Sequence, residues 1–119
     1  MTTKTIHQFT LTGAVVPKAR PRVTRKGTFL PQRYRDWKEE AIASLLTQRT
    51  KYEPLEKVTI SIELYGAARG DLDNIAGAIL DALVQAGIIF DDRISLVKAL
   101  SIRHYGEKIK KAVVKIEEV

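Results

Sequence analysis

Residues 70–92, GDLDNIAGAILDALVQAGIIFDD, restrict the folds open to this chain more than any other stretch. Apolar side chains recur every three or four positions from Leu72 to Ala86, which predicts one amphipathic helix of about fourteen residues. Gly87 follows as the expected C-terminal cap. Alternating segments on both sides predict strands, so we expect this helix to pack on a sheet.

The rest of the chain divides into one more helix and four strands. Helical spacing predicts a helix over 31–48, and alternation predicts strands over 5–13, 57–65, 93–105 and 108–118. We expect the last two strands to pair with each other through a turn at Gly106-Glu107. The order β-α-β-α-β-β predicts an α+β fold with a mixed sheet and two helices packed on it, as a single domain over 1–119.

Carboxylates lie at both ends of the helix predicted within residues 70–92. Asp71 and Asp73 are two apart and point to the same side if the chain there is extended. Asp91 and Asp92 leave the far end, about 20 Å away by the helical rise. They join the first pair only if residues 88–90 run back along the helix; otherwise a partner strand or a second subunit must complete the cluster.

Each of these acids also has a simpler explanation. Asp71 or Asp73 is a good N-cap, and Asp91-Asp92 is a common turn sequence. Asp81, in the middle of the helix, is expected to be exposed or to lie next to the metal ligands. The chain has no Cys, and its two His are isolated, so any metal is expected to be bound by oxygen, as Mg²⁺ or Mn²⁺ is.

The positive charge is concentrated in residues 17–38, which hold eight basic residues and one acidic residue, while the remaining 12 basic and 13 acidic residues nearly cancel. Three prolines stiffen this segment, and 25–27 is expected to be a turn. Such a segment fits a phosphate backbone, although a solvated loop is the alternative. Trp37 is expected to anchor the core. The candidate DNA-binding residues are Lys18, Arg20, Arg22, Arg25, Lys26, Arg33, Arg35 and Arg69.

These parts suit metal-assisted phosphodiester hydrolysis, in which two or three Asp hold one or two cations. Lys98 falls on the apolar face of the strand predicted over 93–105. It either reaches past a sheet edge to water or points at the carboxylates, where an ammonium stabilises developing charge. A serine or cysteine nucleophile paired with a histidine base is not evident.

Four motifs together resemble the RusA-type Holliday junction resolvases of bacteria and their phages: PKARPR at 17–22, PQRYRDW at 31–37, DLDN at 71–74 followed by DAL at 81–83, and IIFDDRISLV at 88–97. The resemblance implies a homodimer that cuts four-way branched DNA symmetrically with Mg²⁺ or Mn²⁺, in the cytoplasm of a bacterial or phage-infected cell. By motif position, Asp71, Asp73 and Asp92 would be metal-binding acids, with Asp91 as an additional ligand.

The chain departs from the resemblance at Gly77, where some family members carry a catalytic-type Lys. Either Lys98 or Arg69 then takes the role of that Lys, or the activity is reduced; Asp71, Asp73, Asp92 and Lys98 form the predicted catalytic set. The alternative function is a branched-DNA-binding module of the same fold that does not cut. A nucleotidyl transferase is a weaker alternative, because no glycine-rich phosphate loop is present. No membrane span or export signal is expected.

Overall fold

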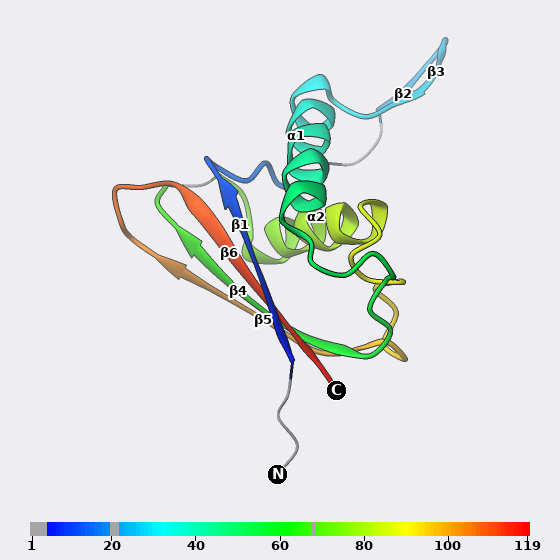
Figure 1. Cartoon of the computed structure of the whole chain (residues 1–119). Helices are drawn as coiled ribbons and strands as arrows, with labels where there is room; N and C mark the ends of the chain where they lie inside the picture. Colours follow the sequence, from blue (N-terminus) through cyan, green and yellow to red (C-terminus); the bar gives the residue numbers. More distant parts are fainter. Residues whose placement is uncertain (1–4, 20–21, 68) are drawn as a thin grey trace.

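The computed structural model describes residues 5–19, 22–67 and 69–119, with no side-chain description for Arg22 (Figure 1). The elements in chain order are β1 (Ile6–Thr12), β2 (Arg22–Thr24), β3 (Gly27–Phe29), α1 (Gln32–Gln48), β4 (Val58–Tyr65), α2 (Leu72–Gln85), β5 (Val97–Tyr105) and β6 (Lys111–Glu118). Both helices and the four long strands were predicted, so the α+β class with a mixed sheet and two helices is confirmed. No helix among the described residues is long and apolar enough to cross a membrane.

The four long strands form one sheet in the order β1-β6-β4-β5. β4 and β5 are parallel and are joined through α2, whereas β6 is antiparallel to both β1 and β4. The two helices lie on one face of this sheet (Figure 1). α2 therefore begins near the C-terminal end of β4 and runs back toward the end of the sheet at which β5 begins.

The predicted pairing of the last two strands with each other is wrong. β6 lies between β1 and β4, with Val114 opposite both Phe9 and Ile62. Its consecutive buried residues Ala112, Val113 and Val114 are typical of a central strand, whereas β5 is largely exposed at the sheet edge.

The crossover from β5 to β6 passes over the end of β4. Gly66 there has φ +83°, and a Cβ on it would lie 2.9 Å from the carbonyl oxygen of Ile109. Only glycine accommodates both this backbone conformation and this close approach. The turn after Tyr105 is therefore a connection across β4 rather than a hairpin.

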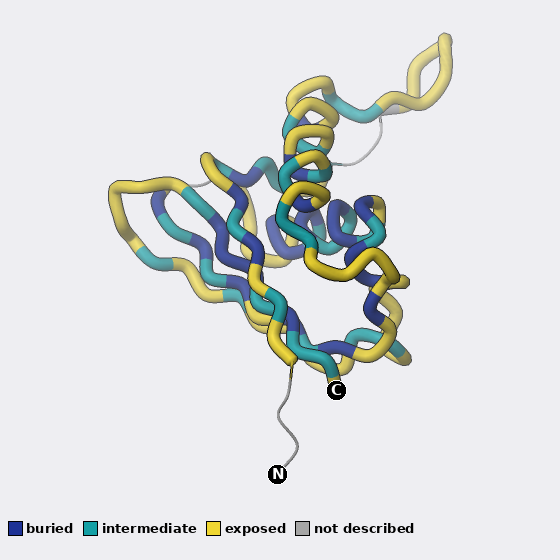
Figure 2. Tube along the Cα trace, in the orientation of Figure 1, coloured by how far each residue is buried: buried dark blue, intermediate teal, exposed yellow. Residues whose placement is uncertain are grey.

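The core lies between the sheet and the helices, where the buried residues concentrate (Figure 2). Ile75, Ile79 and Leu83 of α2 are buried in this core together with the alternating apolar side chains of β4, as their spacing predicts. Trp37 of α1 is partly buried against this core, which confirms its role as an anchor. Ile94 is 90% exposed because β5 begins only at Val97, after a turn over residues 93–96.

The basic segment forms a two-stranded hairpin, β2–β3, which projects away from the body of the molecule (Figure 1). Arg25 and Lys26 occupy its turn, as the sequence predicted. The two strands have three residues each and were missed, because alternation over so short a length cannot be told from an extended loop.

Candidate functional site

Asp71 and Asp73 lie at the N-terminal end of α2. Asp71 occupies the N-cap position with extended backbone angles, but its side chain makes no capping hydrogen bond. The carboxylate of Asp73 accepts a hydrogen bond from the backbone N–H of Asn74 at 2.9 Å. Both residues are exposed at the end of the helix where the backbone N–H groups point outward. Capping by its side chain therefore does not explain Asp71, whose carboxylate makes no capping hydrogen bond within the described residues.

Gly70, which directly precedes this pair of acids, has a backbone conformation that other residues rarely adopt. Its φ is +98°, and a Cβ on it would lie 2.5 Å from Cγ of Pro17. The basic segment is thus packed directly against the turn that precedes Asp71.

Replacing Gly70 with Ala is expected to lower the free energy of unfolding by about 1 to 3 kcal/mol, because the left-handed backbone is strained and Pro17 must move. Urea unfolding of the two proteins measures this difference. Gly106→Ala is the matched control, since Gly106 has ordinary φ and open space around it, and it should be close to neutral. Equal stability of Gly70→Ala and wild type would contradict the packing of Pro17 on this turn.

Asp91 and Asp92 follow the other end of α2. The carboxylate of Asp91 accepts two hydrogen bonds from the Arg93 guanidinium, at 2.9 and 2.6 Å, and one from the backbone N–H of Asp92 at 2.7 Å. These bonds, with Arg93 the largest contributor, hold the pKa of Asp91 below its usual range. Asp92 is exposed and is the more open of the two carboxylates.

One chain does not bring all four acids together. Residues 88–90 pair with Leu55, whose N–H donates to the Ile88 carbonyl and whose carbonyl accepts from the Phe90 N–H, both at 2.9 Å. This segment therefore runs beside the connector that precedes β4 and does not return along α2. Figure 1 shows the two ends of α2 well separated. Within the described residues, no three Asp, Glu or His side chains are close enough together to hold a metal ion.

Arg69, two residues before Asp71 in the chain, contributes to a basic cleft of about 290 Å³. Arg33 of α1, Arg69 of the loop before α2 and Lys110 of the β5–β6 crossover line it, together with small apolar residues. Sequence reasoning named the two arginines but missed Lys110. Its position depends on the strand order, because its carbonyl accepts from the Gly13 N–H at 2.9 Å only when β6 lies next to β1. Three cations from three elements make this cleft suited to a phosphate.

The other predicted cations lie in different settings. Arg25 and Lys26 are exposed at the hairpin turn, and Arg35 donates a hydrogen bond to the side chain of Gln32. Arg20 and the side chain of Arg22 are outside the described residues. Their contribution to DNA binding stays a prediction.

Lys98 lies near the start of β5, where the register between β4 and β5 shifts. It is exposed and has no ion-pair partner in the described part of the chain. It lies at the end of the sheet that carries Asp91 and Asp92, away from the start of α2. Its catalytic role stays a prediction.

Lys18 makes a contact that the sequence did not suggest. Its ammonium lies 3.3 Å from the carboxylate of Asp81, which also accepts a hydrogen bond from the Tyr34 hydroxyl at 3.3 Å. Burial, then the charge and hydrogen bond of Asp81, raise the pKa of Tyr34 to about 12. The alkyl chain of Lys18 covers Gly77, so a lysine from the basic segment lies over the position that lacks one in α2.

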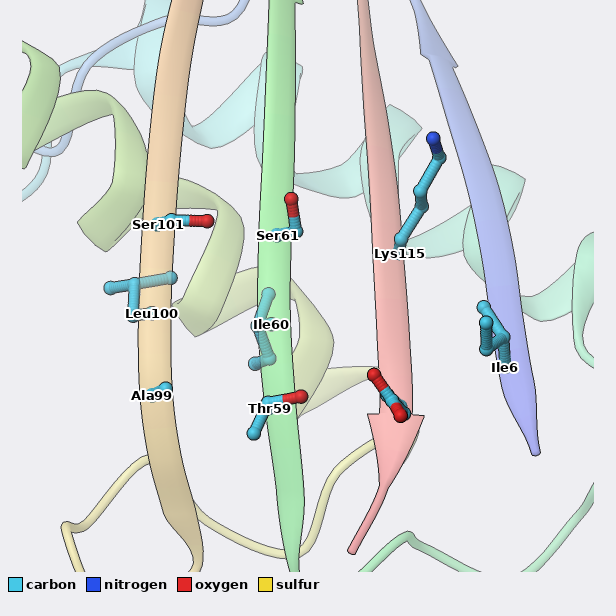
Figure 3. Close-up of a pocket in the computed structure, with 9 residues that line it drawn as sticks. Ile6, Thr59, Ile60, Ser61, Ala99, Leu100, Ser101 and Lys115 are labelled. Carbon is cyan, nitrogen blue, oxygen red and sulfur yellow. The ribbon is translucent and has the colours of Figure 1, made fainter. Parts of the chain in front are cut away.

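A separate cavity of about 280 Å³ lies on the sheet face that the helices leave open (Figure 3). Small and hydroxyl side chains such as Thr59, Ser61 and Ser101 line it, with Lys115 at its side. None of the predicted site residues contributes to it. The chemistry expected from the sequence therefore belongs to the surroundings of α2 rather than to this hollow.

The geometry thus combines exposed carboxylates at a helix start with a basic cleft and a projecting basic hairpin. A comparison with curated proteins found no match. A comparison with protein families matched residues 12–117 to the family described as Endodeoxyribonuclease RusA. Because this match spans nearly the whole of a 119-residue chain, the protein belongs to the RusA endodeoxyribonuclease family.

Proposed function

We propose that this protein is a homodimeric, Mg²⁺- or Mn²⁺-dependent endonuclease that resolves four-way DNA junctions by paired symmetric cuts, in the cytoplasm of a bacterial or phage-infected cell. Membership of the RusA family implies nuclease activity on Holliday junctions. The observation that carries the proposal is the pair of exposed acids, Asp71 and Asp73, which follow closely in the chain on Arg69, one of three cations that line a basic cleft.

The carboxylates fit a hard divalent cation, but one chain supplies them in two separate pairs. Asp71 and Asp73 share the start of α2, whereas Asp91 and Asp92 follow its end. A dimer in which the start of one α2 meets the end of the other supplies three or four carboxylates at one point. We therefore assign the cation to Asp71 and Asp73 of one chain and the partner subunit's Asp92, with Asp91 held mainly by Arg93.

When bound, the cation lowers the pKa of a coordinated water and neutralises charge on the leaving oxygen. The residues of the chain place the DNA for that chemistry. Arg33, Arg69 and Lys110 hold a phosphate in the cleft, and the exposed cations of the hairpin contact the backbone further along. Lys98 comes six residues after Asp92 and is exposed near the start of β5, so the same subunit would bring both residues toward the shared site.

Two-fold symmetry connects this arrangement to its substrate. A dimer with one symmetry axis carries two identical sites, and a four-way junction presents two equivalent strands. Two matched cuts then follow from one bound complex, which is what resolution of a junction requires.

The test uses a synthetic four-way junction with labelled strands, and a linear duplex of the same sequence as the control substrate. With Mg²⁺ or Mn²⁺ we expect paired nicks at symmetric positions on the junction and few on the duplex. Excess chelator should stop cutting while binding persists. Tight binding without nicks in either metal would instead support the alternative, a module that grips branched DNA without cutting it.

A further inference from the structure

Three elements meet at the carboxylate of Asp81. Lys18, from the segment after β1, places its ammonium 3.3 Å from Oδ2 and 3.4 Å from Oδ1. Tyr34, in the first turn of α1, donates its hydroxyl to Oδ2 at 3.3 Å. Asp81 belongs to α2 and has a side chain only 24% exposed. One carboxylate of the acid-bearing helix therefore binds two side chains that lie sixteen positions apart in the sequence.

Residues 17–18 are also fixed to α2 through the backbone. The N–H of Lys18 donates to the Asn74 carbonyl at 2.9 Å. Pro17 packs against Gly70, and the Lys18 alkyl chain packs against Gly77, where a Cβ would lie 3.4 Å from Cδ. The two glycines leave room for the chain to lie along the first turns of the helix. This contact is continuous from the turn before Asp71 to Asp81.

The contacts of Lys18 and Tyr34 with Asp81 lie just before and just after the β2–β3 hairpin in the chain. Residues 19–33, which we call the basic arm, contain β2 and β3 and lie between Lys18 and Tyr34. The two residues that flank the arm, Lys18 and Tyr34, thus both contact the carboxylate of Asp81, while Arg25 and Lys26 at its turn are exposed.

We propose that Asp81, through Lys18 and Tyr34, is a positioning residue that sets the basic arm against the acid-bearing end of α2 and so aligns bound DNA for cutting; this rests on the proposed nuclease function. Asp81 follows Asp73 by eight residues, about 12 Å along the helix, which is too far to share a cation with it. Asp81 therefore acts on the reaction through the arm and not through the metal.

The nature of the bonds supports this role. Tyr34 is 2% exposed, and its raised pKa keeps the hydroxyl protonated as a donor at any pH used to assay a nuclease. A buried donor left without its acceptor is costly, so the Tyr34–Asp81 bond holds the start of α1 in place. The half-exposed Lys18 then connects the other end of the arm to the same point.

The first test is single-turnover cutting of the four-way junction by Asp81→Asn, Lys18→Gln and Tyr34→Phe. We expect each cutting rate to fall about tenfold to a hundredfold, because small misplacements of a substrate are that costly. The junction Kd should change less than about threefold, with cuts spread over neighbouring positions. Lys18→Arg should restore most of the rate. Asp81→Asn combined with Lys18→Gln should be no slower than the slower single variant, since both break one link.

The matched control is Lys51→Gln. Lys51 pairs with Glu118 at 3.3 Å with similar exposure, but far from the arm, so its loss should leave cutting unchanged. If Lys18 instead acts only by contacting a phosphate, Lys18→Gln should weaken binding, whereas Asp81→Asn, which removes a negative charge, should tighten it without slowing the cut. That pattern would overturn the positioning role.

The second test does not depend on activity. The chain has no Cys, so spin labels can be attached through Thr28→Cys on β3 and Gln85→Cys at the end of α2, both exposed positions. We expect a narrow distribution of distances between the labels in the wild-type background and a broad one with Asp81→Asn or Tyr34→Phe. Equal widths would refute the proposal. Broadening in a protein that never cuts would refute only the nuclease function.

Discussion

Asp73→Asn is expected to lower the rate of junction cutting by about a thousandfold or more, because it removes a charged ligand of the proposed cation. The side chain is exposed at the start of α2, and within the described residues its carboxylate accepts a single hydrogen bond, from the N–H of Asn74. An amide oxygen can still accept that bond, so the free energy of unfolding should change by less than about 0.5 kcal/mol. Junction affinity should stay the same or rise slightly, since a negative charge has been lost.

Single-turnover cutting, binding and urea unfolding of the same preparation measure these three quantities. Glu56→Gln is the control, because it makes the equivalent change at an exposed acid of the connector before β4 and should leave all three unchanged. Normal cutting by Asp73→Asn would show that this carboxylate only supports the helix start. Its partner Asp71 would then need a different cation site.

A mixture of Asp73→Asn and Asp92→Asn proteins is expected to nick junctions although neither protein does so alone. In the proposed dimer, each site combines the helix start of one chain with the segment after the helix of the other. In a mixed dimer, both substitutions then lie in one site, and the second site keeps all its native residues. Because only one site remains, the products should be single nicks and not paired cuts.

The control mixture combines Asp71→Asn with Asp73→Asn. Both residues lie at the start of α2, so each site of a mixed dimer contains one of the two substitutions. We therefore expect no cutting. If the first mixture is also inactive after subunits have exchanged, all the ligands come from one chain. The four acids would then have to approach one another by a change in the segment over residues 88–92.

Much of the fold follows from local patterns in the sequence. The helical spacing of Tyr34, Ala41 and Leu45, and that of Ile75, Ile79 and Leu83, predicted the buried faces of both helices. Alternation in β4 predicted its buried face in the same way. It did not identify the partners of β6, because alternation tells which side of a strand is buried and not which strand lies beside it. The three buried residues in succession in β6 were the available signal for a central position.

In the candidate site, too, local sequence patterns identified some residues and missed those that depend on contacts between distant segments. The exposed acids at each end of α2 and the basic hairpin turn could be named from residue type and spacing. Asp81 was underestimated, because its partners Lys18 and Tyr34 lie 63 and 47 residues away. Lys110 was missed for the same reason, since its place in the basic cleft requires the crossover over β4. Contacts between distant segments were the part that local pattern could not supply.

The length of α2 carries a further consequence for the product of the reaction. If each site uses the start of one α2 and the end of the other, the two helices lie antiparallel and each one spans from one site to the next. Its 14 residues then act as a ruler, which sets the two sites about 21 Å apart, close to the width of a DNA duplex. In that arrangement, the length of α2 would set the spacing of the two cuts on a junction.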